Sequence, residues 1–158
     1  MRRWVSIYLL CLIIPSLGAI PVDAQRNLVA FSKAPILIES GGKAHKFTVE
    51  LALSQRQQLQ GLMLRRQMAP DAGMLFVYRR EESNAMWMKN TFLPLDMLFI
   101  GRDGVVKKIV ERTVPLSEET ITSGGPVVAV LELNAGTASR LGLKPGDKVI
   151  AAALGTGD

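Results

Sequence analysis

The segment MWMKNTFLPLD, residues 86–96, brings side chains that could do chemistry into an otherwise apolar part of the sequence. In an extended strand alternate side chains share a face, so Trp87 and Lys89 would point to one side and Asn90 to the other. The proline in this segment cannot donate a backbone hydrogen bond, which indicates an edge or crossing segment before the next strand. We expect Lys89, Asn90 and Asp96 to flank one concave spot and to form a polar rim around a binding site.

A carboxylate inside a strongly apolar stretch is the second chemical signal. Glu132 lies within VVAVLEL, residues 127–133, where burying a charge is costly unless a cation or several donors meet it. Lys89, Arg65 or a backbone turn could supply that partner. One interpretation is a structural ion pair or a solvent-facing strand end; the other is a polar cluster lining a small-ligand pocket. The candidate ligand-binding residues are Trp87, Lys89, Asn90, Asp96, Glu132 and Arg65.

Two other chemistries fit parts of this pattern. A carboxylate and a lysine could support hydrolysis, but the sequence has no Gly-x-Ser-x-Gly, phosphate-loop, dinucleotide or His-Glu-x-x-His motif. Copper(I) could bind the thioethers of Met86 and Met88, although methionine is also a common core filler. The single histidine, His45, falls on the apolar face of a predicted strand. We therefore assign no catalytic residue, no metal and no cofactor, and we favour binding over catalysis; a structural or interaction protein without a pocket is a further alternative.

The N-terminus has the features of an export signal. A basic start, MRR, precedes an apolar run over residues 4–17, and small residues lead up to Ala24. The run is short for a membrane span and contains Pro15. We expect residues 1–24 to be a signal peptide, with cleavage after Ala19 or retention as an anchor as the alternatives, and the protein to be exported, either periplasmic or secreted.

Removal of residues 1–24 would also remove Cys11, the only cysteine. The mature protein would then contain no disulfide and would depend on packing for its stability. Residues 25–158 hold 17 Lys and Arg against 13 Asp and Glu, a net charge of +4, and the basic residues are scattered rather than gathered in an aromatic-interleaved stripe. We expect a small molecule or an envelope component as partner, no nucleic acid, membrane contact only through an uncleaved signal segment, and a monomer by default.

The positions that could do chemistry must be held by strands, because the apolar residues alternate or run in short blocks. Paired glycines at 41–42 and the turn at 101–104 predict two hairpins, over residues 36–53 and 96–111. Further strands are expected at 74–78, 127–133 and 148–153.

Two short helical segments should connect these strands. Ser54 can cap a helix from Gln55 to about Met63, with Leu59, Leu62 and Met63 as its apolar stripe, and Asn134 can cap a short turn ending near residue 141. The result is one mainly β domain of the α+β class over residues 35–153. A linker over 25–34 should precede it, and a frayed end over 154–158 should follow it.

Three blocks of the sequence resemble a known family in their order and spacing. They are GLMLRRQMAPDAGMLFVY, MWMKNTFLPLDMLFIGRDGVV and AVLELNAGTASRLGLKPGDKV, and they are similar to the signature blocks of the bacterial and archaeal proteins grouped as domain of unknown function 192. The resemblance covers about residues 35–153. It implies a compact, barrel-like domain with an antiparallel or mixed sheet and one or two short helices. It implies no catalytic residues, because the family has no assigned function.

Overall fold

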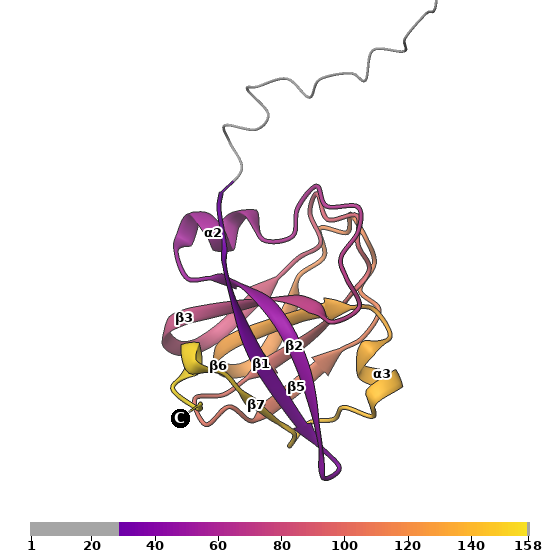
Figure 1. Ribbon diagram of the computed structural model, residues 1–158. Helices are drawn as coiled ribbons and strands as arrows, with labels where there is room; N and C mark the ends of the chain where they lie inside the picture. Colours follow the sequence, from indigo (N-terminus) through magenta and orange to yellow (C-terminus); the bar gives the residue numbers. More distant parts are fainter. Residues whose placement is uncertain (1–28, 158) are drawn as a thin grey trace, which may run out of the picture.

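A single curled sheet forms the body of the molecule. The computed structural model describes residues 29–157, so the predicted signal peptide lies outside the described residues. Seven strands in the order β5-β4-β6-β3-β2-β1-β7 make a half-barrel (Figure 1), and a bridge between Val105 and Lys148 brings its two edges together. This confirms the predicted mainly β, barrel-like fold. The strands are β1 Ser32–Ser40, β2 Lys43–Ala52, β3 Ala72–Met86, β4 Leu95–Ile100, β5 Val106–Val110, β6 Ile121–Asn134 and β7 Lys148–Ile150.

The two ends of the domain extend further than the sequence predicted. β1 begins at Ser32, inside the stretch predicted as a linker, and it pairs with β2 on one side and with β7 on the other. At the C-terminus a turn of 3-10 helix, η1 Ala152–Leu154, is followed by Thr156. The Thr156 hydroxyl accepts a hydrogen bond from the Ala151 amide at 3.0 Å. Residues predicted to fray are therefore tied to the sheet, because a side chain supplies the missing backbone partner.

Both faces of the central strand β6 are covered, which explains its continuous apolar sequence. Leu131 and Leu133 belong to the core inside the curl of the sheet, whereas Val130 belongs to a second core on the other face. The second core contains Met74, Phe76, Met88, Leu93, Leu95, Met97 and Phe99. Because Glu132 pairs across the sheet with Met74 and Met97, its side chain shares the face of this second core.

The connection between β2 and β3 covers part of that second face. These two strands are parallel, so the chain must cross over, and it does so through α2 Gln55–Gln60. Ser54 caps α2 as predicted, in a reciprocal capping box with Gln57. The predicted apolar stripe was partly wrong: the helix ends at Gln60, and Leu59 is 64% exposed. In the described residues no helix is long and apolar enough to cross a membrane.

Asp96 has a structural position rather than the place on a polar rim that the sequence suggested. Its side chain is completely buried, and its two oxygens accept hydrogen bonds from three backbone amides. Oδ1 accepts from Arg112 at 2.9 Å and Gly136 at 3.1 Å, and Oδ2 accepts from Ala138 at 2.8 Å. This carboxylate therefore holds the start of α3 Thr137–Leu141 against β4.

The prediction that Asn134 caps this second helix was wrong. Asn134 ends β6, and its side-chain amide donates to the carbonyls of Met68 and Ala69. The amides at the start of α3 are already satisfied by Asp96, which is distant in sequence but adjacent in the sheet. Gly136 occupies the N-cap position with a φ of 82°, which a residue without Cβ adopts at little cost.

Replacing Asp96 with asparagine should destabilise the fold. One carboxylate oxygen would become an amide donor that faces backbone N–H groups, so at least one buried amide would lose its acceptor. We expect a loss of about 2–4 kcal/mol in the free energy of unfolding, measured by urea denaturation. Asp71→Asn, at an exposed position, is the control and should change it by less than about 0.5 kcal/mol. Equal losses in the two variants would contradict the role given to Asp96.

Candidate functional site: a cavity below α2

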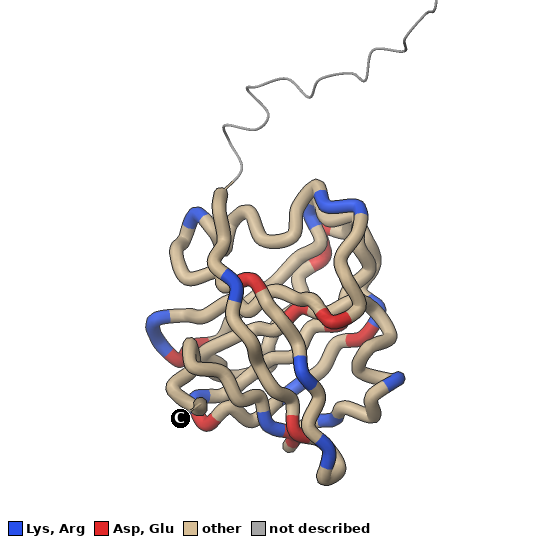
Figure 2. Tube along the Cα trace, in the orientation of Figure 1, with Lys and Arg blue, Asp and Glu red and all other residues tan. Residues whose placement is uncertain are grey.

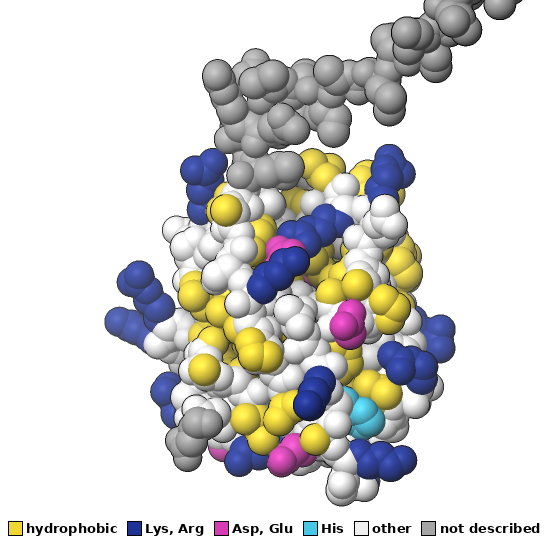
Figure 3. All heavy atoms as spheres, viewed as in Figure 1, with side chains coloured by type: hydrophobic (Ala, Val, Ile, Leu, Met, Phe, Trp, Pro, Cys, Tyr) yellow, Lys and Arg dark blue, Asp and Glu magenta, His cyan; other side chains and the backbone are white. Residues whose placement is uncertain are grey.

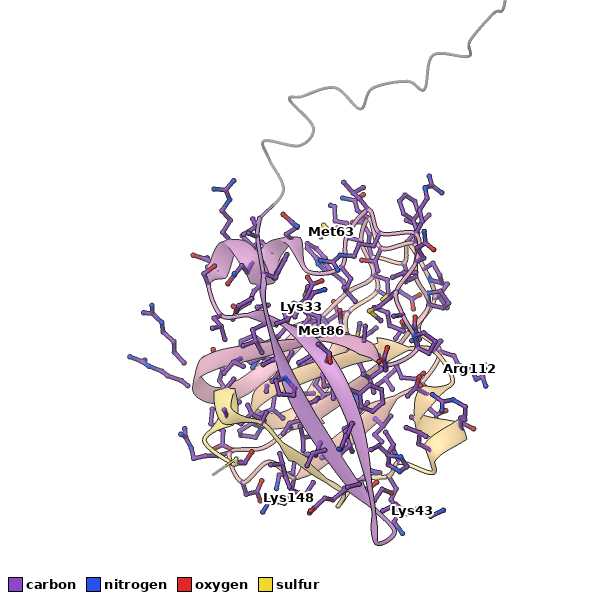
Figure 4. All side chains as sticks on the ribbon, in the orientation of Figure 1. Lys33, Lys43, Met63, Met86, Arg112 and Lys148 are labelled. Carbon is purple, nitrogen blue, oxygen red and sulfur yellow. The ribbon has the colours of Figure 1, made fainter. Side chains whose placement is uncertain are left out.

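A cavity of about 240 Å³ opens between α2, the end of β3 and the segment that follows it. Its walls are apolar side chains interspersed with neutral polar ones. Met63 and Met86, labelled in Figure 4, contribute from beyond the end of α2 and from the end of β3. The lining residues are Gln55, Gln58, Leu59, Gln60, Gly61, Leu62, Met63, Phe76, Tyr78, Asn84, Ala85, Met86, Trp87, Thr91 and Glu132. We call this space the Glu132 cavity.

Glu132 is the only acidic residue in the lining, and it is buried, with 4% of its surface exposed. Within the described residues no lysine or arginine pairs with its carboxyl group, and no donor is within hydrogen-bond geometry of it. On either side across the sheet lie Met74 and Met97, both completely buried. The carboxyl group therefore faces the cavity from an apolar floor.

This environment changes the acidity of two groups. Burial raises the pKa of Glu132 from 4.5 to about 8, because an apolar environment disfavours the charged form. Burial also raises the pKa of Tyr78 well above its ordinary value, and the nearby Glu132 raises it further. Both groups are thus protonated at neutral pH, and no other residue of the lining titrates. The cavity is consequently uncharged, and its polar lining groups are neutral.

The two methionines considered as copper ligands have separate partners. The Tyr78 hydroxyl donates to the sulfur of Met86 at 3.4 Å, and the Thr113 hydroxyl donates to the sulfur of Met88 at 3.1 Å. Met86 lines the cavity, whereas Met88 is buried in the second core. Copper(I) binding by this pair stays a prediction, and the geometry lends it little support because the two thioethers face different surroundings.

The remaining candidates of the proposed polar rim are not brought together. Lys89 lies on the surface, where it pairs with Glu118 at 3.5 Å and lies 5.3 Å from the centre of the Trp87 ring. Asn90 is exposed and adopts a φ of 54°, which suits a turn. Asp96 is consumed by backbone amides. Of the six candidate ligand-binding residues, only Trp87 and Glu132 line the cavity.

Arg65 does not neutralise Glu132. Its guanidinium group makes a two-pronged ion pair with Glu50, with one nitrogen–oxygen distance of 2.8 Å, and the hydrogen bonds from Arg65 lower the pKa of that glutamate. The guanidinium group also lies 5.7 Å from the centre of the Phe31 ring. This pairing leaves the Glu132 carboxyl without a cation.

A hydrolase would need groups that this geometry keeps apart. Asp96 pairs across the sheet with Leu133, and Glu132 pairs with Met97, so the two carboxyl groups lie on opposite faces of the sheet. In the part of the chain that the structure describes, no group of three or more His, Cys, Asp and Glu side chains could hold a metal. The Nε2 atom of His45 is buried without a hydrogen-bond partner, and it lies outside the Glu132 cavity. Asp96 and Glu132 therefore cannot act together on one bond.

Sequence reasoning missed most of the cavity wall. Tyr78, Phe76 and Gln58 were each assigned to a predicted strand or helix, but no local pattern indicates that α2 lies over the end of β3. The amide of Gln58 donates to the carbonyl of Val77 at 2.8 Å and fixes that arrangement. The sequence did single out the acid within VVAVLEL and Trp87, and both lie in the cavity wall.

Comparison with known proteins gives a family and two related structures. The sequence model of the DUF192 family, described as "Uncharacterized ACR", matches residues 36–151. The crystal structure of a candidate transcription regulator from Sinorhizobium meliloti 1021 is 52% identical, covers 80% of this chain and 98% of that chain, and has a TM-score of 0.78. The crystal structure of a protein of unknown function from Novosphingobium aromaticivorans DSM 12444 is 35% identical in sequence and has a TM-score of 0.74. The match covers 85% of this chain and 100% of that chain. No protein with a curated description matches.

Glu132→Gln should remove a pH-dependent loss of stability. Between pH 4.5 and about 8 the folded state keeps a proton on Glu132 that the unfolded chain releases. The free energy of unfolding of the native protein should therefore fall as pH rises through this window and then level off above about pH 8.

The glutamine variant cannot ionise, so at about pH 9 it should be more stable than the native protein, by a few kcal/mol at most. Its free energy of unfolding should also change less with pH. Urea denaturation across this pH range measures the effect, with Glu118→Gln, an exposed glutamate, as control. Identical pH profiles for native protein and Glu132→Gln would show that Glu132 is solvated in the folded state.

Proposed function

The chain belongs to the DUF192 family of uncharacterised proteins, and we propose that it is an exported domain that binds a small ligand in the Glu132 cavity. The proposal of export depends on the N-terminal sequence, where a basic start, an apolar run and small residues precede Ala24. The proposal of ligand binding depends mainly on one observation: the buried carboxyl group of Glu132 faces a cavity, and no described residue pairs with it. Concave sites with few polar groups among apolar ones are typical of small-ligand pockets.

The unpaired carboxyl group indicates what the ligand should carry. A carboxyl group in a poorly solvated cavity is costly to leave without a hydrogen-bond donor, and a ligand that supplies one stabilises it. A cationic amine is the best complement, because it can pair with the ionised form of Glu132. With a pKa of about 8, ionising that acid at about pH 7 costs only roughly 1 kcal/mol. An ion pair in a poorly solvated cavity can offset this cost.

The rest of the lining indicates an apolar body for the ligand. Phe76, Leu62 and the thioether of Met86 offer apolar contact, and the ring of Trp87 lies at the exposed edge with 47% of its surface accessible. Aromatic faces also attract alkylammonium groups. Anionic ligands are disfavoured, since no residue of the lining is basic. A short alkyl chain with one amino group fits both the volume and the chemistry.

Nucleic-acid binding, which the description of the Sinorhizobium relative would suggest, has weaker support. Figure 2 shows Lys and Arg distributed around the described chain and interspersed with Asp and Glu rather than gathered on one face. Several of them have acidic partners at short range, including Arg65 with Glu50 and Lys107 with Asp103. A basic footprint of the kind that binds phosphate backbones is not formed by these residues.

A series of ligands with one alkyl chain and different charge tests the proposal. Hexylamine, 1-hexanol and hexanoate would be titrated into the purified chain at neutral pH, with thermal unfolding and calorimetry as readouts. A ligand that binds only the folded state at a hundred times its dissociation constant adds about 2.7 kcal/mol of stability. We expect hexylamine to bind most tightly and to raise the unfolding temperature most. 1-Hexanol should bind more weakly, and hexanoate should have no effect.

Three variants make this test specific to the cavity. Ala85→Trp should fill the space and abolish binding, since Ala85 belongs to the lining. Glu132→Gln should abolish the preference for the amine but retain the alcohol. Lys89 lies outside the lining, so the Lys89→Ala variant should bind hexylamine as the native protein does. Binding that survives Ala85→Trp would place the site elsewhere, and absence of binding by both amine and alcohol would refute the proposal.

A further inference from the structure

We propose that the end of the molecule carrying the mouth of the Glu132 cavity docks onto the surface of an anionic lipid bilayer. The contact is made by an apolar rim, defined here as Leu59, Leu64, Trp87, Val114 and Leu116. Figure 3 shows apolar side chains mixed with Lys and Arg at the end of the molecule where the described chain begins. The inference does not depend on the identity of the ligand.

The exposed apolar residues are concentrated rather than scattered. Within residues 29–157 six large apolar side chains are strongly exposed, and all but Leu53 belong to the rim. The rim lies on three segments that are joined by backbone hydrogen bonds. The amide of Leu64 donates to the carbonyl of Asn90, and the amide of Leu116 donates to that of Thr91. A patch of this kind, on connected loops, marks an interaction surface.

Two leucines of the rim are held in a strained backbone conformation. Leu64 has a φ of 64° and Leu116 a φ of 63°, in the left-handed region that Gly and Asn occupy far more readily than leucine. Their side chains are 62% and 53% exposed, so folding gains little packing from them. An apolar side chain at a strained and exposed position is explained if its burial occurs on contact with another surface.

The surroundings of the rim favour a bilayer as that surface. Lys89, which also pairs with the exposed Glu118, lies 5.3 Å from the centre of the Trp87 ring, and Arg66 lies 4.8 Å from the centre of the Phe92 ring. Tryptophan beside lysine or arginine is typical of the level of lipid headgroups, where the ring is partly buried and the cation faces phosphate. Basic residues near the surface also gain attraction from anionic lipids.

The path of the chain agrees with this orientation. The amide of Val29 donates to the side chain of Gln60 at 2.7 Å, and Gln57 donates to the carbonyl of Ala30 at 2.9 Å. The described chain therefore starts beside α2, at the end that carries the rim (Figure 1). The apolar run over residues 4–17 precedes this point in the sequence, so a membrane-inserted N-terminus would bring the same end toward the bilayer.

Fluorescence of Trp87 gives a direct test of this docking. The sequence has two tryptophans, Trp4 and Trp87, so Trp4→Phe leaves Trp87 as the only emitter. The full chain with this substitution would be mixed with vesicles of phosphatidylcholine and phosphatidylglycerol that carry brominated acyl chains. We expect strong quenching of Trp87, and weaker quenching with phosphatidylcholine alone.

The strained leucines provide a variant that should separate docking from folding. The double variant Leu64→Asn, Leu116→Asn places asparagine, which tolerates the left-handed backbone, at both positions. Its urea midpoint should therefore be unchanged or higher, while its vesicle partition coefficient should fall roughly tenfold. Leu53→Asn removes the exposed leucine outside the rim and should leave quenching unchanged. The proposal is overturned if Trp87 is not quenched in the Trp4→Phe chain, or if the double variant is quenched to the same extent as that chain.

Discussion

One buried carboxylate determines how the parts of this fold meet. Asp96 accepts hydrogen bonds from three backbone amides that belong to the end of the β4–β5 hairpin and to the start of α3. β4 itself pairs with β6, and β6 carries Glu132 on the face of the sheet opposite to Asp96. Among the described residues the carboxyl group of Glu132 has no such donors. The sheet thus contains two buried acids in opposite situations: backbone amides bind one, and no described residue pairs with the other.

The second face of the sheet carries both a packed core and the Glu132 cavity. Methionines fill much of its core, and their flexible side chains adapt to irregular spaces. The cover over this face is thin, because the crossover helix α2 buries none of its residues. The cavity lies where this cover ends, and its exposed edge merges with the apolar rim through Leu59 and Trp87. A ligand that is partly apolar could therefore pass between a lipid surface and the cavity without full exposure to water.

Local patterns were enough to predict most of the fold. The paired glycines at 41 and 42, each with positive φ, form the predicted hairpin turn, and the Ser54 cap followed from its spacing to Gln57. The partner of Asp96 could not be predicted, because backbone amides leave no signature in the sequence. The costly position of Glu132 was visible, whereas its lack of a cation required the structure, in which Arg65 binds Glu50 instead. Nothing in the sequence indicates the left-handed backbone of Leu64 and Leu116.

The thin attachment of α2 also has a kinetic consequence. Side-chain amides hold the helix: Gln58 donates to the carbonyls of Ala52 and Val77, and Gln57 donates to that of Ala30. A segment held by a few polar contacts at the surface can detach without unfolding the sheet, so its opening free energy lies well below that of the whole domain. Such an opening would widen the cavity, because α2 contributes Gln55, Gln58 and Gln60 to its wall. Amide hydrogen exchange in residues 55–60 would report the opening, and an occupied cavity would slow it.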